Sequence, residues 1–411
     1  MLVIAPGARR LCTIVAAVSI AVLAGCTTPP PPPPPPVAPV APPTPLAPHQ
    51  LTADQPDFLR LPNMAKDKTP LRVGVILPFS NASPGTRALA GAMLKAAELA
   101  LYDSGNRDVV LMTADDSARP EEAAAAANRL LAQGAEVLIG PLFAASVTAV
   151  APAARDRGVP VIAFSTDRTV AGNGVYLLSF QPQNEVRRVI AYAIEQGHKN
   201  FAALIPGTSY GQVSEQAFRE AVAAGGGTVS SVEKFSPNAG AVMDQAAAIA
   251  KTGADAVFIA QGGATLRAIA PTLALNGVDT AKVKLLGTGL WDDLAITREA
   301  ALRDGWFAAP APETDAKFVA SYRETFGSAP PQLAALAYDA VSLAALIGAG
   351  TPYHRFTPSA LTDPNGFSGV DGIFRFSADG SIDRGLSVLA VRPGGFAVVS
   401  PAPVTFQGKG S

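Results

Sequence analysis

Cysteine and histidine are scarce in this chain, and both absences limit the chemistry it can perform. The 411 residues include two cysteines, Cys12 and Cys26, and three histidines, His49, His198 and His354. Both cysteines lie near the N-terminus, so we expect no disulfide, cysteine nucleophile or thiolate metal site in the folded part. Three scattered histidines are also too few for a usual transition-metal site. We therefore predict no metal and no cofactor.

An excess of charge of one sign is missing as well. Lys and Arg total 32 against 33 for Asp and Glu, which gives a formal net charge of -1. This balance, without long runs of one sign, predicts no nucleic-acid partner and no polybasic contact with a membrane. With 48% apolar residues, the chain is long enough to bury a sizeable core in one large domain or two medium ones.

The N-terminus has the pattern of a secretory signal. Two arginines precede an apolar run, 11–23, that is too short to span a bilayer comfortably. Two small residues then precede Cys26, a pattern that resembles the bacterial lipobox, in which the cysteine is acylated and becomes the first residue of the mature chain. The alternative is an ordinary signal peptide with an incidental cysteine. We predict a signal peptide over 1–25 and a membrane anchor through lipidated Cys26.

A proline tract follows the predicted anchor. Residues 29–36 are eight consecutive prolines, which cannot form helix or sheet because each ring removes an N–H donor and fixes φ. At about 3.1 Å per residue they form a rod of roughly 25 Å. Such tracts can also be ligands for aromatic grooves, but a position between an anchor and a folded domain favours a spacer. We predict a disordered, Pro-rich linker over 26–70.

From residue 71 the sequence alternates between short apolar runs and amphipathic stretches. This pattern predicts strands and helices in turn, twice over, and therefore two lobes with parallel sheets covered on both faces. The fold class is α/β, with two doubly wound lobes joined by a hinge. The predicted domain runs over 71–400, followed by a tail at 401–411. Its parts are lobe 1 at about 71–180 and 311–350, lobe 2 at about 181–310, and C-terminal antiparallel strands at 368–400.

Several of these stretches also resemble a known family. They are "DDSARPEEAAAAANRLL" (115–131), "VLIGPLFAASV" (137–147), "GVPVIAFSTD" (158–167), "SYGQ" (209–212) and "GVDGIFRFSADG" (369–380). In this order they resemble the branched-chain amino acid binding proteins, which have the type I periplasmic binding fold. The resemblance implies a non-enzymatic protein that closes over a cleft by a hinge near 180–183 and 308–312.

Candidate ligand contacts follow the strand ends that would line this cleft. In the relatives, hydroxyls and backbone amides after the third strand hold the ligand carboxylate, and an aromatic and an acidic group in the second lobe hold the ammonium. The hydroxyl expected at Ala144 is missing here, and so is the acid of the second lobe. About half of the contacts that hold an amino acid in the relatives are therefore absent here. The cleft candidates are Ser80, Phe143, Ala144, Ser146, Ser165, Thr166, Asp167, Tyr210, Gln261 and Trp291.

A hydrolase is the remote alternative. "GTSYG" (207–211) matches the G-x-S-x-G nucleophile elbow and lies between a predicted strand and a predicted helix. A triad also needs a histidine, and His354 follows Ser209 in the right chain order. The same five residues match the Tyr-Gly helix opening of the binding family, so we predict no catalytic residue.

The chain combines a predicted lipid anchor, a proline spacer and a binding domain with an incomplete amino-acid site. In this combination it resembles the penicillin-binding protein activators. This resemblance implies a lipoprotein that stimulates a peptidoglycan synthase by protein contact. By resemblance to bacterial lipoproteins, Thr27 after the cysteine implies sorting to the outer membrane, facing the periplasm. The alternative is the substrate-binding lipoprotein of an ABC importer, or a sensor, with an amino acid or small peptide as its ligand.

Overall fold

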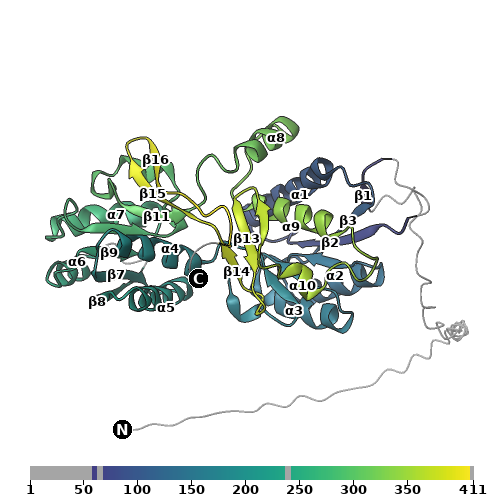
Figure 1. The fold of residues 1–411 in the computed structure, drawn as a ribbon, viewed down its shortest axis with the longest axis horizontal. Coiled ribbons are helices and arrows are strands. Elements are labelled where there is room, and N and C mark those ends of the chain that lie inside the picture. The colour runs from purple at the N-terminus through teal and green to yellow at the C-terminus, as the bar shows by residue number, and fades with distance from the viewer. Residues whose placement is uncertain (1–57, 63–67, 237–241, 408–411) are drawn as a thin grey trace, which may run out of the picture. The chain divides into compact units, whose positions relative to one another are not determined.

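The computed structural model describes residues 58–62, 68–236 and 242–407. The predicted signal peptide, Cys26 and the proline tract lie outside the described residues. Within them, two α/β lobes are each built around a mostly parallel sheet, as the alternation of strands and helices predicts (Figure 1). The predicted α/β fold class is confirmed. No helix in the described ranges is both long and apolar enough to cross a membrane.

Lobe 1 contains a six-stranded sheet in the order β1-β3-β2-β4-β5-β6, in which only β1 runs antiparallel. Its strands are β1 Phe58–Arg60, β2 Leu71–Leu77, β3 Val109–Asp115, β4 Val137–Ile139, β5 Val161–Ala163 and β6 Val175–Leu177. Its helices are α1 Pro84–Ser104, α2 Pro120–Ala132, α3 Ala144–Asp156, α8 Ala316–Phe326, α9 Ala334–Ile347 and the short α10 Pro358–Leu361. Buried strands of this kind read as continuous apolar runs because helices cover both faces.

Two apolar layers hold lobe 1 together. On one face of the sheet, α1, α8 and α9 pack over side chains such as Val73 and Val75. On the other face, α2 and α3 pack over residues such as Ile76 and Leu138. The helix α2 begins with Pro120 in its first turn, where a missing N–H costs nothing.

Lobe 2 contains a seven-stranded sheet in the order β16-β15-β11-β10-β9-β7-β8. Its strands are β7 Asn200–Pro206, β8 Thr228–Phe235, β9 Ala256–Ile259, β10 Lys284–Gly287, β11 Trp306–Ala309, β15 Ser387–Arg392 and β16 Gly395–Ser400. Its helices are α4 Pro182–Glu195, α5 Ser209–Ala224, α6 Met243–Ala250 and α7 Gly263–Leu275. The C-terminal strands β15 and β16 are antiparallel, as predicted.

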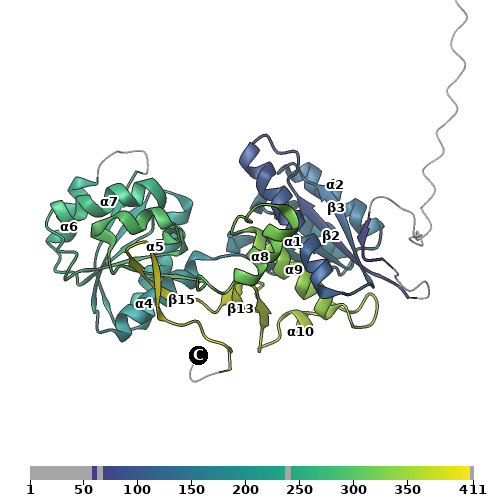
Figure 2. The same ribbon diagram turned by 90° about the horizontal axis from the view of Figure 1, so that it is seen from above.

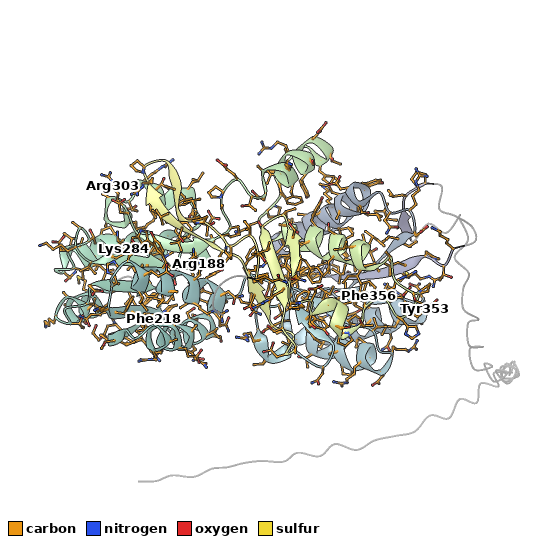
Figure 3. All side chains as sticks on the ribbon, viewed as in Figure 1. Arg188, Phe218, Lys284, Arg303, Tyr353 and Phe356 are labelled. Carbon is orange, nitrogen blue, oxygen red and sulfur yellow. The ribbon has the colours of Figure 1, made fainter. Side chains whose placement is uncertain are left out.

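The helices of lobe 2 also cover both faces of its sheet (Figure 2). Side chains of α6 and α7 pack on one face, with Trp291 among them. Side chains of α4 and α5 pack on the other, among them Phe218 of α5 (Figure 3). Phe218 stacks on Phe258 of β9, with ring centroids 5.4 Å apart. Each lobe therefore has its own core.

The chain passes between the lobes three times. It crosses between β6 and α4, between β11 and α8, and between β14 and β15. A small antiparallel sheet precedes the last crossing, made of β12 Phe367–Gly369, β13 Gly372–Phe376 and β14 Ile382–Arg384. The first two crossings coincide with the predicted hinge segments.

Sequence and structure differ at a few strands. Strand β1 lies inside the range predicted as a disordered linker. It pairs with β3, a segment much later in the chain, and the local sequence of β1 does not indicate this pairing. Strands β6 and β11 were not predicted either, because each follows the preceding strand with only short 3-10 turns between them and so falls outside the alternation of strands and α-helices.

Candidate functional site

Each sheet has a point where the strand order reverses, and ligands of such sheets bind outside the strand ends at that point. In lobe 1, β2 lies between β3 and β4, so the loops after β2 and β4 diverge from one another. In lobe 2, β7 lies between β8 and β9, so the loops after β7 and β9 diverge in the same way. The sequence-predicted contacts follow these strands or their neighbours.

A cavity of about 660 Å³ lies at the strand ends of lobe 1. Its wall is mainly apolar, with hydroxyl groups around it. The lining residues are Ser83, Gly85, Thr86, Leu89, Leu142, Phe143, Ala144, Phe164, Ser165, Thr166, Asp167, Ser179, Phe180, Leu333 and Leu336. We call this cavity the lobe 1 pocket. Among these residues none is a lysine or arginine.

The first turns of three helices converge on the lobe 1 pocket. Ser83 caps α1 by accepting a hydrogen bond from the Thr86 N–H at 3.4 Å. The helices α3 and α9 begin after Phe143 and Leu333, and in the described residues no side chain caps either of them. Free N–H groups and the positive ends of helix dipoles attract anions. The pocket therefore offers helix N–H groups to an anionic group beside an apolar wall, while the Asp167 carboxylate in the same lining opposes a second negative charge.

A second cavity, of about 470 Å³, is lined by both lobes. Lobe 1 contributes residues 166–169, and lobe 2 contributes the first turn of α4 and one face of α5 from Ser209 to Glu220. Tyr210 lies here and its hydroxyl is 2.8 Å from Thr288 Oγ1. Burial, and then the nearby Glu185 carboxylate, raise the pKa of Tyr210, so its hydroxyl stays neutral. Thr166 and Asp167 also line the lobe 1 pocket and so join the two cavities.

Glu185, in the first turn of α4, was not found by the sequence analysis. It is 7% exposed, and its Oε2 accepts a hydrogen bond from the Gly289 N–H at 2.9 Å. Burial raises its pKa to about 7, against which the Gly289 N–H and the Arg384 charge act. Gly289 leaves room for it, since a Cβ there would lie 2.9 Å from Glu185 Oε1. An acid in a helix first turn is common, so no sequence signal marks this one.

Six of the ten predicted contacts lie together in the structure. Phe143, Ala144, Ser165, Thr166 and Asp167 line the lobe 1 pocket, and Tyr210 lines the second cavity. Asp167 Oδ1 accepts from the Thr169 N–H at 2.9 Å and from the Thr169 hydroxyl at 2.7 Å. It caps a short turn as well as facing the pocket.

The other four predicted contacts do not line either cavity. Ser80 is exposed, with its Oγ 2.7 Å from Ser117 Oγ. Ser146 is fully buried beside Asp116, whose pKa burial raises. Trp291 is also fully buried and donates to the carbonyl oxygen of Gln261 at 3.0 Å. Ser146, Gln261 and Trp291 therefore line neither the lobe 1 pocket nor the second cavity.

Among the described residues, no histidine lines the cavity that contains Ser209, the serine of the G-x-S-x-G stretch. Ser209 opens α5 and lines the second cavity, while His354 lines a different cavity in lobe 1. His198 lies 3.4 Å from Asp255 and packs on Trp306, at the other end of β7. In the described ranges no group of three His, Cys, Asp or Glu side chains is arranged to hold a metal ion.

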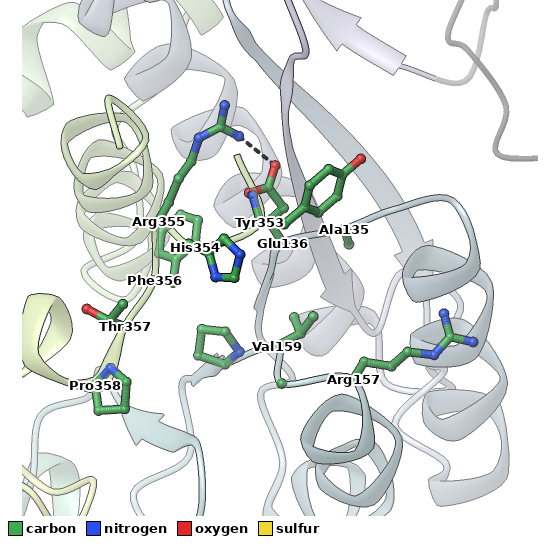
Figure 4. A pocket seen from close by; sticks show the side chains of 12 residues that line it. Ala135, Glu136, Arg157, Val159, Tyr353, His354, Arg355, Phe356, Thr357 and Pro358 are labelled. Carbon is green, nitrogen blue, oxygen red and sulfur yellow. Dashed lines mark hydrogen bonds and ion pairs between the residues drawn. The ribbon is translucent and has the colours of Figure 1, made fainter. Parts of the chain in front are cut away.

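The cavity that contains His354 measures about 260 Å³ and lies at the amino ends of β4 and β5 (Figure 4). Beside it, Glu136 and Arg355 form a buried ion pair at 2.5 Å. Glu136 also accepts from the Tyr353 N–H at 2.6 Å, which holds Tyr353 at a φ of 62°. These contacts fasten the loop after α9 to the sheet.

Comparisons with known proteins agree with this architecture. A curated relative, the uncharacterized protein RP748 of Rickettsia prowazekii, is 20% identical over 43% of this chain. The match covers 46% of that relative, so the chain spans less than half of its length.

Solved structures match over more of the chain. A protein of Rhodospirillum rubrum, named as part of a branched-chain amino acid ABC transporter, superposes with a TM-score of 0.72 at 22% identity, over 80% of this chain and 100% of that one. A solute-binding protein of an ABC transporter of Rhodopseudomonas palustris, solved with 3,4-dihydroxybenzoic acid, gives a TM-score of 0.58 at 19% identity, over 82% and 97%. At these identities the likeness shows the fold.

The family follows from the sequence itself. The sequence pattern of the periplasmic binding proteins matches residues 70–395, which are most of the 411 residues and include both lobes. The protein therefore belongs to the periplasmic binding protein family, whose members act in the periplasm and bind ligands without catalysing a reaction.

Proposed function

We propose that the protein captures a small solute with a carboxylate and an apolar body, as the solute-binding component of an ABC importer. The uncapped first turn of α3 at the apolar lobe 1 pocket carries this proposal. Ala144 is the first residue of that helix, and its small side chain leaves the backbone amides open to a ligand. A carboxylate placed there would take the role of the missing cap.

The apolar wall supplies the rest of the binding free energy. Phe143 is 39% exposed, and Phe164, Phe180 and Leu336 line the same pocket. Burying apolar surface is worth about 25 cal/mol per Å² before the costs of association. The two structural relatives are named for a branched-chain amino acid transporter and a complex with a dihydroxybenzoic acid. Both ligand types combine a carboxylate with an apolar body, which supports this solute class.

A thermal-shift screen followed by calorimetry tests the proposal. The probes are leucine, isoleucine and 3,4-dihydroxybenzoate, with methyl esters of each as controls that lack the carboxylate charge. A ligand of the folded state at 100 times its Kd stabilises it by about 2.7 kcal/mol. We expect at least one of the free carboxylates to raise the Tm and its ester to fail.

A pair of variants then locates the site. Ala144→Glu places a carboxylate at the proposed anion position and should abolish binding. Ala145→Glu is the matched control, because Ala145 is exposed, lies in the same first turn and does not line the pocket. Equal affinities in the two variants, or no response to any probe, would refute the proposal.

A second function rests on the N-terminal sequence. A lipid on Cys26 and the proline tract after it would suit an activator of a peptidoglycan synthase, held at the outer membrane and acting by contact. Neither relative described above is named as such an activator. Fractionation of cells with and without Cys26→Ser tests the anchor, since only the unchanged chain should float with outer membranes. Stimulation of a purified synthase by the protein would favour this second function.

A further inference from the structure

The last described residues of the chain connect the two lobes once more. Strand β16 ends at Ser400 at the edge of the lobe 2 sheet, and the sequence predicts only a tail after it. Residues 401–407 (PAPVTFQ) instead run from β16 to the segment of lobe 1 that leads into β12. They form no helix or strand, yet they make contacts at both ends. We call residues 401–407 the C-terminal strap.

The first residues of the C-terminal strap are bound to lobe 2. Arg188 of α4 (Figure 3) donates from Nη2 to Ser400 Oγ at 2.5 Å and to the Pro401 carbonyl oxygen at 3.3 Å. The Ala402 N–H donates to Ser387 Oγ of β15 at 3.0 Å. A helix and a strand of lobe 2 therefore fix the direction in which the strap leaves this lobe.

The far end of the C-terminal strap rests on lobe 1. The Phe406 ring is half-buried, and the guanidinium of Arg375 on β13 lies 4.6 Å from its centroid. The ring also packs on Gly366, where a Cβ would lie 2.9 Å from two of the ring carbons. Beside the ring, Gln407 Nε2 donates to Asn365 Oδ1. Phe406 is therefore the anchor of the strap.

The small sheet under this anchor belongs to lobe 1. Phe374 and Phe376 of β13 and Ile382 of β14 are buried in the lobe 1 core, together with side chains of α1 and α9. The anchor thus lies in one lobe, while the bonds of Ser400 and Ala402 lie in the other. The strap is a tie between the lobes whose far end is held by non-covalent contacts alone.

The short length of the C-terminal strap limits how far its two ends can separate. Ala402 and Phe406 are four residues apart, so their Cα atoms can be at most about 14 Å from one another. Pro401 and Pro403 have fixed φ angles, which leaves the detached strap fewer conformations to lose when Phe406 binds. The anchor packs beside β12, which lies two strands from β14 and so about 10 Å from the last crossing. An attachment at that distance resists rotation of the lobes about the crossing.

We propose that the C-terminal strap restrains the separation of the lobes, and that Phe406 must leave lobe 1 before they separate further than the strap reaches. A cation–π contact at a partly exposed site favours the bound form by about twofold to fivefold. The strap is therefore a reversible restraint, and molecules exchange between a tied and a released form. It needs no solute, so this inference does not rest on the proposed function.

Distances between spin labels test the restraint without any solute. The labels go on Tyr102→Cys in lobe 1 and Leu275→Cys in lobe 2, in the full chain with Cys12→Ser and Cys26→Ser. The two labelled side chains are 53% and 87% exposed, so the labels do not disturb the core. Separations beyond the main population of this parent chain are counted as wide.

Variants of the strap identify the anchor. Phe406→Ala removes the ring, and we expect the ratio of wide to narrow separations to rise about twofold to fivefold. Val404→Ala is the matched control, since Val404 lies in the same strap and is 89% exposed, and it should leave the distances unchanged. A chain that ends after Ala402 keeps the bonds to lobe 2 and loses the anchor, so it should widen the distances at least as much as Phe406→Ala.

Loss of the anchor must change the lobe distances if the strap restrains them. Distances that match those of the parent chain in either Phe406→Ala or the shortened chain would overturn the proposal, and so would an equal widening in Val404→Ala. If the shortened chain fails to fold, Phe406→Ala decides, because it leaves the backbone of the strap intact. If the distances widen as expected while no solute binds, the strap stands and the proposed function fails.

Discussion

The buried ion pair of Glu136 and Arg355 offers a quantitative test of what holds lobe 1 together. The two side chains are 3% and 6% exposed, and Arg355 also donates to the carbonyl oxygen of Gly350 at 3.2 Å. Arg355→Met leaves the Glu136 carboxylate buried with one charged neighbour fewer. Its pKa, already raised by burial, should rise further.

Breaking one half of a buried pair costs about 3–5 kcal/mol, because the remaining charge keeps its desolvation penalty. For a domain of this size each kcal/mol lowers Tm by about 2 °C, so we expect a fall of about 6–10 °C. Thermal unfolding followed by circular dichroism measures it. Arg157→Met is the control, since Arg157 lines the same cavity but is exposed, and surface changes stay within about 0.5 kcal/mol.

The double variant Glu136→Gln with Arg355→Met tests whether the uncompensated charge of Glu136, and not the loss of the Arg355 contacts, lowers the Tm. If the single variant suffers from an uncompensated charge, removal of that charge should restore several degrees of the lost Tm. An additive fall in the double variant, or a fall below about 2 °C in Arg355→Met, would refute the reasoning from desolvation.

Three further predictions concern single residues of the two lobes. Glu185 has a folded pKa of about 7 against 4.5 in the unfolded chain, so the native state binds the extra proton and Tm should fall from about pH 5 to about pH 8; Glu185→Gln should flatten that slope. Trp291→Ala empties a fully buried site and should cost about 3–5 kcal/mol in denaturant unfolding. Gly211→Ala would place a Cβ 1.9 Å from the Pro206 carbonyl oxygen and should lower Tm, whereas Gly91→Ala, with nothing within 4 Å, should raise stability by about 0.5–1 kcal/mol.

The strand-and-helix alternation was predictable because it depends on local patterns. In α1, Pro84–Ser104, apolar side chains recur at helical spacing, and Ala90, Met93, Ala97 and Leu101 are buried. The spacing of apolar side chains and the caps and prolines at helix ends are visible along the chain itself. Strand β6 follows β5 without an α-helix between them, so the alternation did not indicate it.

The candidate site was predictable only where it follows a strand. Phe143, Ser165 and Thr166 come directly after β4 or β5, and the parallel topology brings those ends to one edge. Leu333 and Leu336 enter the same pocket from α9, far along the chain, and apolar residues in a helix look like ordinary core. Their role depends on how α9 packs beside α1.

The sequence by itself determined the α/β class, the two lobes, two of the three crossings that join them and the absence of cysteine from the folded part, because period, composition and order along the chain carry that information. Tertiary structure decided which side chains share a cavity and which are buried. Trp291 and Ser146, which the sequence suggested as ligand contacts, are fully buried. The tertiary structure also placed Phe406, near the C-terminal end of the described residues, against Arg375 and Gly366, since contacts are set by distance in space and not by distance in sequence.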